Sequence, residues 1–174
     1  MTKDAKVYIV GAGPGDPELI TRKGARLLSE ADLVIYAGSL VNEEILGHCR
    51  AGCRVLDSAS MTLEEQVDAM VRAADDGKLV VRLHTGDPSL YGAIAEQIRQ
   101  LRARGVSSEI VPGVSSLQGA AARLGIEYTV PGGTQTLICT RISGRTPVPE
   151  REKVEILAAH GTTLVLFLSS DRVE

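Results

Sequence analysis

The residues with the most evident chemical potential lie in one short stretch, residues 84–92, with the sequence His-Thr-Gly-Asp-Pro-Ser-Leu-Tyr-Gly. An apolar run typical of a buried strand, residues 79–83, precedes it, and a helical pattern follows from about residue 91 to residue 104. Open α/β sheets bind ligands at such turns, at the carboxyl ends of their strands. Gly86 lets a ligand approach the backbone, and Asp87 can accept hydrogen bonds from an amine or a hydroxyl. The alternative is that Asp87 only caps the turn, as Asp often does.

Two further small-residue turns follow predicted strands. Residues 11–17 (Gly-Ala-Gly-Pro-Gly-Asp-Pro) come after the apolar strand 6–10, and residues 112–116 (Pro-Gly-Val-Ser-Ser) come after the strand 109–111. If the sheet is parallel, all of these turns gather at its carboxyl edge. This expected convergence favours a ligand site over a local cap.

The first of these turns is not a dinucleotide fingerprint. The pattern G-x-G-x-x-G requires a third glycine at position 16, where Asp16 stands, and Pro14 lacks an N–H for a pyrophosphate. A nicotinamide site also needs an acidic residue near the end of the second strand, where Ala37 and Gly38 stand. Asp16 followed by Pro17 instead predicts the start of a helix.

The elements that position these turns alternate regularly along the chain. The pattern predicts strands at residues 6–10, 32–36, 54–57, 79–83 and 109–111, and helices at 17–31, 43–49, 62–77, 91–104 and 117–124. A capping box, Thr62 with Glu65, begins the third of these helices. The alternation predicts an α/β fold: a mostly parallel sheet with helices on both faces.

A change of character after residue 125 predicts a second domain. Residues 1–125 form the predicted N-terminal α/β domain, and residues 126–133 are a Pro/Gly-bearing connector. Residues 134–174 are expected to begin a second α/β domain that is incomplete, with strands at 134–140 and 162–168 and a helix at 151–159.

Composition narrows the classes of function. The net charge is −3, and the chain has no Trp, 1 Phe and 4 Tyr, which disfavours nucleic-acid binding. No apolar run is long enough to span a membrane, and no secretory leader is expected. Three cysteines, Cys49, Cys53 and Cys139, suggest a reducing compartment, so a cytoplasmic location is expected. No metal site is predicted, because Cys49 and Cys53 have only His48 as a nearby further ligand.

Four ordered segments together resemble the tetrapyrrole methylase family. They are residues 10–21, 36–41, 84–92 and 111–116. The resemblance implies an enzyme that uses S-adenosyl-L-methionine as methyl donor and releases S-adenosyl-L-homocysteine. It also implies two α/β domains with the donor in a cleft between them, a small-molecule tetrapyrrole substrate and a homodimer.

Within the family, residues 84–88 and 140–150 favour members that methylate C11 of precorrin-4 or cobalt-precorrin-4 in cobalamin biosynthesis. One alternative is methylation of another position of the corrin precursor or of uroporphyrinogen III. The others are a nicotinamide- or flavin-binding oxidoreductase, or a binding module without activity.

The resemblance also implies a set of donor-binding residues. By position these are Pro14, Thr85, Gly86, Asp87, Leu90, Ser115, Ser116 and Leu168. One departure matters: the uroporphyrinogen methyltransferases of the family carry an Asp, proposed as a base, where this chain has Gly38. That catalytic role therefore cannot be transferred, and the base is unknown.

Methyl transfer is an in-line displacement in which the protein mainly orients the reactants. It requires no nucleophilic Ser or Cys and no metal. His84 is a weak candidate for helping a proton leave, the alternative being that it only fixes the turn by hydrogen bonding. The substrate carries carboxylates, so Arg141 and Arg145 are candidate substrate-binding residues. The alternative for both is a solvated loop charge.

Overall fold

The computed structural model describes residues 6–144 and 146–170. The chain divides into two compact units, Met1–Gly119 and Ala120–Glu174. The division falls inside helix α4 (Ser116–Leu124), upstream of the predicted connector 126–133. No helix in the described parts of the chain is long and apolar enough to cross a membrane.

The first unit is built on a five-stranded sheet in which every strand is parallel to its neighbours, as predicted. Its order is β3-β2-β4-β1-β5. The strands are β1 (Lys6–Gly11), β2 (Leu33–Tyr36), β3 (Arg54–Asp57), β4 (Val80–His84) and β5 (Ser107–Val111). The helices are α1 (Arg22–Glu30), α2 (Leu63–Asp75) and α3 (Ile94–Ala103), with the short 3₁₀ turns η1 (Pro17–Leu19), η2 (Glu43–His48) and η3 (Ser58–Ser60).

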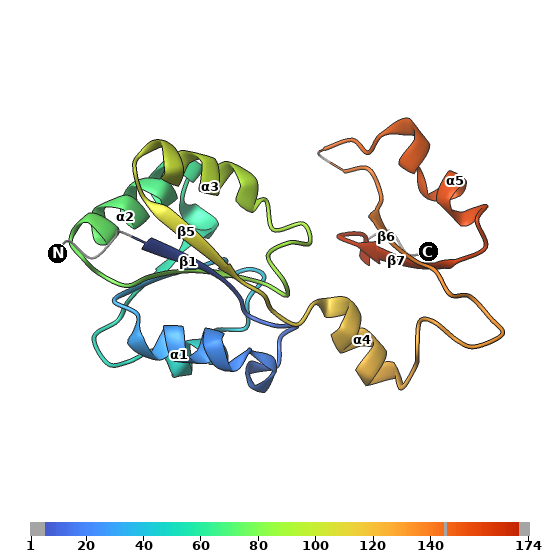
Figure 1. The fold of residues 1–174 in the computed structure, drawn as a ribbon, viewed down its shortest axis with the longest axis horizontal. Helices are drawn as coiled ribbons and strands as arrows, with labels where there is room; N and C mark the ends of the chain where they lie inside the picture. Colours follow the sequence, from blue (N-terminus) through green and yellow to red (C-terminus); the bar gives the residue numbers. More distant parts are fainter. Residues whose placement is uncertain (1–5, 145, 171–174) are drawn as a thin grey trace. The chain divides into compact units, whose positions relative to one another are not determined.

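The sheet has helices on both faces (Figure 1), because its strands carry apolar residues on both sides. One core cluster joins Leu27 and Leu28 of α1 to Val34, Val81 and Leu83. The other joins residues of α2 and α3 to the opposite face, including Val67, Met70, Leu101, Ile35 and Val80. The parallel α/β fold predicted from the sequence is therefore confirmed.

The first predicted helix, residues 17–31, is interrupted. Asp16 caps only η1, where its Oδ1 accepts the N–H of Glu18 at 2.9 Å, and Ile20 is extended with ψ 145°. The helix begins again after Thr21, whose Oγ1 accepts the N–H of Gly24 at 3.1 Å. Asp16 and Thr21 therefore cap separate elements, Asp16 the 3₁₀ turn η1 and Thr21 the helix α1.

The predicted start of α3 near residue 91 is also wrong. Tyr91 and Ala93 have φ of 56° and 50°, so the helix begins only at Ile94. A Cβ on Gly92 would lie 2.3 Å from the carbonyl oxygen of Pro88, which shows how tightly this turn is folded. Tyr91 therefore lies before the helix, and it is 41% exposed.

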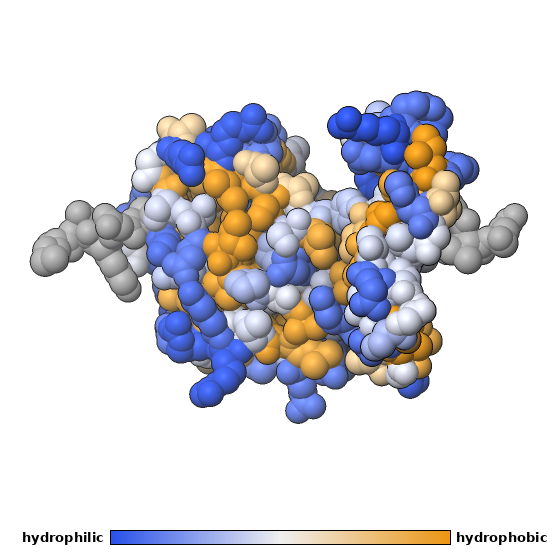
Figure 2. All heavy atoms as spheres, turned by 45° about the vertical axis from the view of Figure 1, so that its right-hand side comes forward, coloured by the Kyte–Doolittle hydropathy of each residue, from blue (hydrophilic) through white to orange (hydrophobic). Residues whose placement is uncertain are grey.

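The second unit contains a pair of parallel strands, β6 (Leu137–Arg141) and β7 (Thr163–Phe167). Between them lie η4 (Glu150–Glu152) and α5 (Val154–Ala158). Residues 134–136 precede β6, so this strand starts later than predicted. The predicted helix 151–159 is divided at Lys153, which is extended with ψ 142°. Figure 2 shows apolar side chains exposed among polar ones on the molecular surface. The exposed apolar residues include Ile110 of the edge strand β5 and Leu166 of β7.

Candidate functional site

Three glycines from separate turns meet at the carboxyl edge of the first unit's sheet, a cluster that we call the glycine junction: Gly11, Gly86 and Gly113. A Cβ on Gly11 would lie 2.5 Å from the carbonyl oxygen of Gly86 and 2.6 Å from Cα of Gly113. A Cβ on Gly113 would lie 2.2 Å from the same carbonyl oxygen. Only glycine permits such contact between backbones. The predicted convergence of the three turns is therefore confirmed.

Backbone hydrogen bonds hold the junction together. The N–H of Ala12 donates to the carbonyl of His84 at 2.7 Å. Gly13 and Gly86 exchange two bonds, of 3.3 Å from Gly13 N–H and 2.8 Å from Gly86 N–H. Both glycines have positive φ, 84° and 59°, a conformation that side chains disfavour. The first and second turns are thus locked to each other through their peptide groups.

The junction lies at the topological switch point of the sheet. β1 and β4 are neighbours, but β1 connects to α1 on one face and β4 connects to α3 on the other. The two connections leave in opposite directions and open a crevice, which is where open α/β sheets bind ligands. The fold therefore places the glycine junction where a ligand is expected.

Asp87 braces this junction with both carboxylate oxygens. Oδ2 accepts the N–H of Gly113 at 2.9 Å, and Oδ1 accepts the N–H of Ser89 at 2.8 Å and the Ser89 hydroxyl. Partial burial acts to raise the pKa of Asp87, but the bonds from Ser89 and Gly113 outweigh it and lower the pKa. The carboxylate is thus a fixed anion that ties the turn after β4 to the turn after β5.

The structure gathers most of the residues expected to bind the donor around the junction. A Cβ on Gly86 would lie 3.6 Å from Cα of Ser115 and 3.7 Å from the backbone N of Ser116. Pro14 lies against Gly119 of α4, and the Leu90 N–H donates to the carbonyl of Asp87 at 3.2 Å. The first unit contains Pro14, Thr85, Gly86, Asp87, Leu90, Ser115 and Ser116. The remaining residue, Leu168, belongs to the second unit, has φ 53° and is 69% exposed.

His84 is buried beneath the junction, at the end of β4, and is 7% exposed. Burial, together with the charge of Arg82 two residues away, lowers the pKa of His84 to about 3. Its Nε2 has no hydrogen-bond partner in the described structure. A neutral, buried imidazole does not exchange protons near pH 7, which argues against His84 as a general base.

In the second unit, Arg141 organises the loop that follows β6. Its guanidinium donates to the carbonyls of Thr146 at 2.8 Å, Pro147 at 3.2 Å and Ile142 at 3.4 Å. A cavity of about 520 Å³ lies beside this loop, with apolar walls and with Arg141 and Lys153 among its lining residues. Arg145 lies outside the described residues.

Asp57, at the end of β3, lies at the same carboxyl edge of the sheet and is not among the residues expected from the sequence. Its Oδ1 accepts two peptide N–H groups, from Gly38 and from Ala59, each at 2.9 Å. The hydrogen bond from Ala59, and after it the one from Gly38, lowers the pKa of Asp57, while desolvation acts in the opposite direction. A Cβ on Gly38 would lie 2.4 Å from Oδ2 of Asp57. In the sequence, the one feature that marks Asp57 is its position as an acidic residue at the end of a predicted strand.

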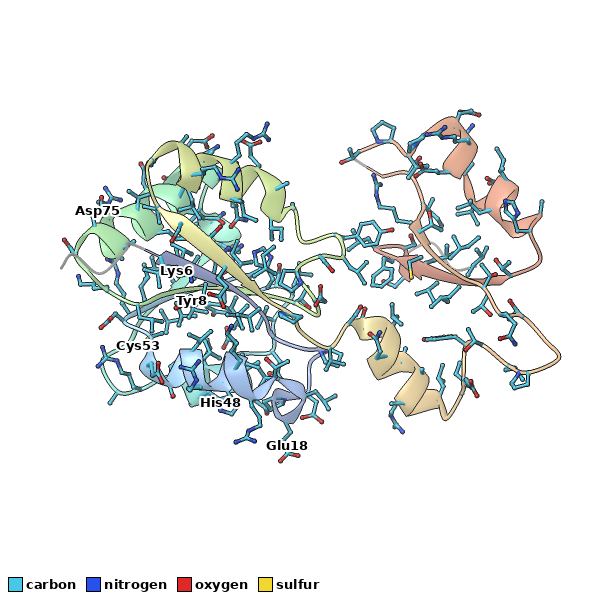
Figure 3. The ribbon with its side chains drawn as sticks, in the orientation of Figure 1. Lys6, Tyr8, Glu18, His48, Cys53 and Asp75 are labelled. Carbon is cyan, nitrogen blue, oxygen red and sulfur yellow. The ribbon has the colours of Figure 1, made fainter. Side chains whose placement is uncertain are left out.

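The cysteine pair lies away from this edge. Cys49 and Cys53 pack on the α1 side of the sheet, and Figure 3 shows Cys53 and His48 on that side. Burial raises the pKa of the Cys49 thiol to about 11, so it is protonated at neutral pH. Among the described residues, no group of three or more His, Cys, Asp or Glu side chains is arranged to hold a metal ion.

Known proteins resemble this chain over nearly its whole length. It is 55% identical over 174 residues to a cobalt-precorrin-4 C(11)-methyltransferase from Methanocaldococcus jannaschii, covering 100% of this chain and 67% of that protein. The corresponding enzyme from Priestia megaterium is 54% identical over 165 residues, covering 95% of this chain and 64% of that protein. The chain thus spans about two thirds of the length of these relatives.

Solved structures agree. The X-ray structure of the cobalamin biosynthetic enzyme cobalt precorrin-4 methyltransferase matches with a TM-score of 0.95 and 53% identity, covering 99% of this chain and 72% of that one. A uroporphyrin-III C-methyltransferase from Thermus thermophilus, complexed with S-adenosylhomocysteine, matches with a TM-score of 0.75 and 33% identity, covering 96% and 67%. The family model of tetrapyrrole (corrin/porphyrin) methylases matches residues 6–174, and the chain belongs to this family.

Proposed function

We propose that the protein transfers a methyl group from S-adenosyl-L-methionine to C11 of cobalt-precorrin-4 or precorrin-4 in cobalamin biosynthesis. The observation that carries the proposal is identity above one half to cobalt-precorrin-4 C(11)-methyltransferases over 95–100% of the chain. Identity to the uroporphyrin-III enzyme is only 33%, which disfavours that substrate. The alternative of a nicotinamide- or flavin-dependent oxidoreductase is not retained, because the family match includes the glycine loop 11–17.

The chemistry of the junction fits such a donor. Exposed Thr85 and Ser116 and buried Ser115 supply hydroxyl groups beside the peptide groups of the small-residue turns. Hydroxyl and peptide groups suit the amino-acid and ribose portions of S-adenosyl-L-methionine. Pro14, Thr85, Gly86, Asp87, Leu90, Ser115, Ser116 and Leu168 are the residues that we propose to hold the donor.

The contribution of the protein to the reaction is mainly orientation. When bound, S-adenosyl-L-methionine supplies the electrophilic methyl group. The glycine junction gives a rigid backbone surface, because Asp87 and the paired bonds of Gly13 and Gly86 fix the turns before any ligand arrives. Fixing two reactants in a productive geometry can contribute about 7–11 kcal/mol to lowering the barrier. Neutral His84, buried at the end of β4, takes no proton.

We assign substrate carboxylates to the loop after β6. Three loop carbonyls already engage the guanidinium of Arg141, so its first effect is to shape the loop. Its charge and that of Lys153 still make the rim of the adjacent cavity attractive to carboxylates, while the apolar walls suit a macrocycle. Arg145 is part of the same proposal.

Assembly as a homodimer also belongs to the proposal. Exposed apolar side chains, such as Ile110 at the sheet edge, offer surface for contact with a second copy. Sedimentation equilibrium at micromolar concentration measures the mass directly. A monomer mass at these concentrations would contradict the assignment.

The activity is tested by incubating the full-length protein with methyl-labelled S-adenosyl-L-methionine and either cobalt-precorrin-4 or uroporphyrinogen III. We expect label in the precorrin alone, at C11 by NMR. Transfer to uroporphyrinogen III alone would contradict the substrate assignment. Calorimetry with S-adenosyl-L-homocysteine is expected to give micromolar binding, and absence of binding would contradict the donor assignment.

A further inference from the structure

The pair formed by Gly38 and Asp57 has a geometry that a local turn does not require. Asp57 ends β3 and Gly38 follows β2, so the two residues lie on neighbouring strands of the same carboxyl edge. The N–H of Gly38 donates to Oδ1 of Asp57, a bond that spans 19 residues of sequence. A cap for η3 needs only the second bond, from Ala59. The first bond fixes the carboxylate against the turn after β2.

The remaining oxygen of Asp57 is uncommitted. Within the described residues, no donor bonds Oδ2 and no Lys or Arg forms an ion pair with Asp57. The side chain is exposed to solvent at this edge. Asp87 differs, because partners engage both of its oxygens. Asp57 therefore presents a fixed negative charge that nothing in the described structure neutralises.

A chain of contacts connects this carboxylate to the glycine loop. The turn that begins with Ala37 and Gly38 leads to Asn42, whose Nδ2 donates to the carbonyl of Gly15 at 2.9 Å. The pKa of Tyr36, the residue before this turn, is raised chiefly by the hydrogen bond that its hydroxyl donates to Glu43, and the charge of Asp57 is the last of the contributing causes. The strand register places the carboxylate of Asp57 at the same carboxyl edge of the sheet as the glycine junction.

Methyl transfer to a carbon of the macrocycle generates positive charge on the macrocycle, which a nearby fixed negative charge would stabilise. The methyl–sulfur bond breaks with its electron pair left on sulfur, and an electron pair of the macrocycle forms the new carbon–carbon bond. The positive charge of the sulfonium therefore passes to the macrocycle, until an N–H or C–H proton leaves to solvent. A fixed anion beside a developing cation stabilises the transition state without reorganisation.

We propose that Asp57 is a catalytic residue that stays ionised and stabilises the cation formed on the tetrapyrrole, with Gly38 providing the space that its carboxylate occupies. This inference rests on the proposed methyltransferase activity. It differs from a general-base role, because the carboxylate takes up no proton during turnover.

The test uses Asp57→Asn in the full-length protein. The Asn Oδ1 can still accept the N–H groups of Gly38 and Ala59, so the turn keeps its geometry and only the charge is lost. We expect kcat with cobalt-precorrin-4 to fall about 10- to 100-fold. The KM for the donor, the affinity for S-adenosyl-L-homocysteine and the melting temperature are expected to stay unchanged. Asp57→Ala, which also removes both bonds, is expected to lower the melting temperature as well.

The matched control is Asp68→Asn on α2, which removes the same charge from an exposed pair with Arg104. It is expected to leave kcat unchanged. A kcat for Asp57→Asn within twofold of the wild-type value would overturn the inference while leaving the methyltransferase assignment intact. Recovery of the lost kcat by the variant at higher pH would also overturn it. A wild-type protein without transfer to any tetrapyrrole would overturn both.

Discussion

Two acidic turns at one sheet edge show how the same residue type can be put to different uses. In the turn after β4, both carboxylate oxygens of Asp87 accept hydrogen bonds, from Ser89 and from Gly113, and so hold two backbone segments together. In the turn after β3, one oxygen of Asp57 accepts two peptide N–H groups, and no donor among the described residues bonds the other oxygen. The first carboxylate is part of the scaffold, and the second presents charge. The two aspartates differ in role because they differ in how many of their carboxylate oxygens accept hydrogen bonds from the protein.

The largest effect is expected at the glycine junction, on which the scaffold role of Asp87 depends. In Gly113→Ala, the new Cβ would lie 2.2 Å from the carbonyl oxygen of Gly86 and 2.8 Å from Cα of Gly11, where only backbone could yield. We expect the free energy of unfolding to fall by about 1–3 kcal/mol and the affinity for S-adenosyl-L-homocysteine to fall more than tenfold. Urea denaturation and calorimetry measure these changes. Gly47→Ala, which meets nothing within 4 Å, is the neutral control.

The two carboxylates can then be compared directly by replacing each with asparagine. An amide nitrogen cannot accept the N–H of Gly113, so Asp87→Asn is expected to lose about 1–2 kcal/mol of stability and to bind S-adenosyl-L-homocysteine more weakly. Asp57→Asn is expected to leave the midpoint of urea denaturation nearly unchanged, because its Oδ1 can still accept both peptide N–H groups. If chemical denaturation showed the two substitutions to be equally destabilising, the distinction between a structural Asp87 and a charge-presenting Asp57 would be contradicted.

The strands, helices and glycine turns could be predicted from the sequence better than the position of the Asp57 carboxylate, for physical reasons. Alternating strands and helices, the capping box at Thr62 and the glycines of the three turns are local signals, and the structure confirms what they indicate. The predicted start of α3 was wrong because Tyr91 and Ala93 adopt positive φ, a backbone conformation that their residue types do not indicate.

Gly38 illustrates what local signals miss. In the sequence it marks the absence of an acidic residue, whereas in the fold the carboxylate of Asp57, 19 residues later, occupies the space beside it. Such a relation between residues on paired strands depends on register, which a single sequence does not specify. Charge geometry at a sheet edge therefore had to come from the structure.

Acid is expected to affect the turn after β4 more than the turn after β3, because a buried imidazole, that of His84, directly precedes the turn after β4. The folded-state pKa of His84 is about 3, below the ordinary value of 6.5. The unfolded chain therefore binds the proton first, and stability falls as the pH drops from about 6.5 toward 3. Between pH 7 and pH 5 we expect His84 to account for a loss of about 1–2 kcal/mol. Urea titrations of wild type and His84→Gln at both pH values measure it, and equal losses would contradict the assignment.

The smallest loss of stability is expected at Asn42, which links the turn after β2 to the glycine loop 11–17. Asn42 caps η2 by accepting the Glu44 N–H at 3.1 Å, and its Nδ2 reaches the carbonyl of Gly15 at 2.9 Å. Asn42→Ser keeps an acceptor for the cap but is too short to reach Gly15. We expect a loss of about 0.5–1 kcal/mol and, if that energy supports the donor loop, a two- to fivefold weaker affinity for S-adenosyl-L-homocysteine. An unchanged affinity in calorimetry, with the stability loss present, would show that the glycine junction is rigid without this link. The carboxylate of Asp57 would then act on the reaction only through its charge and not through the position of the donor loop.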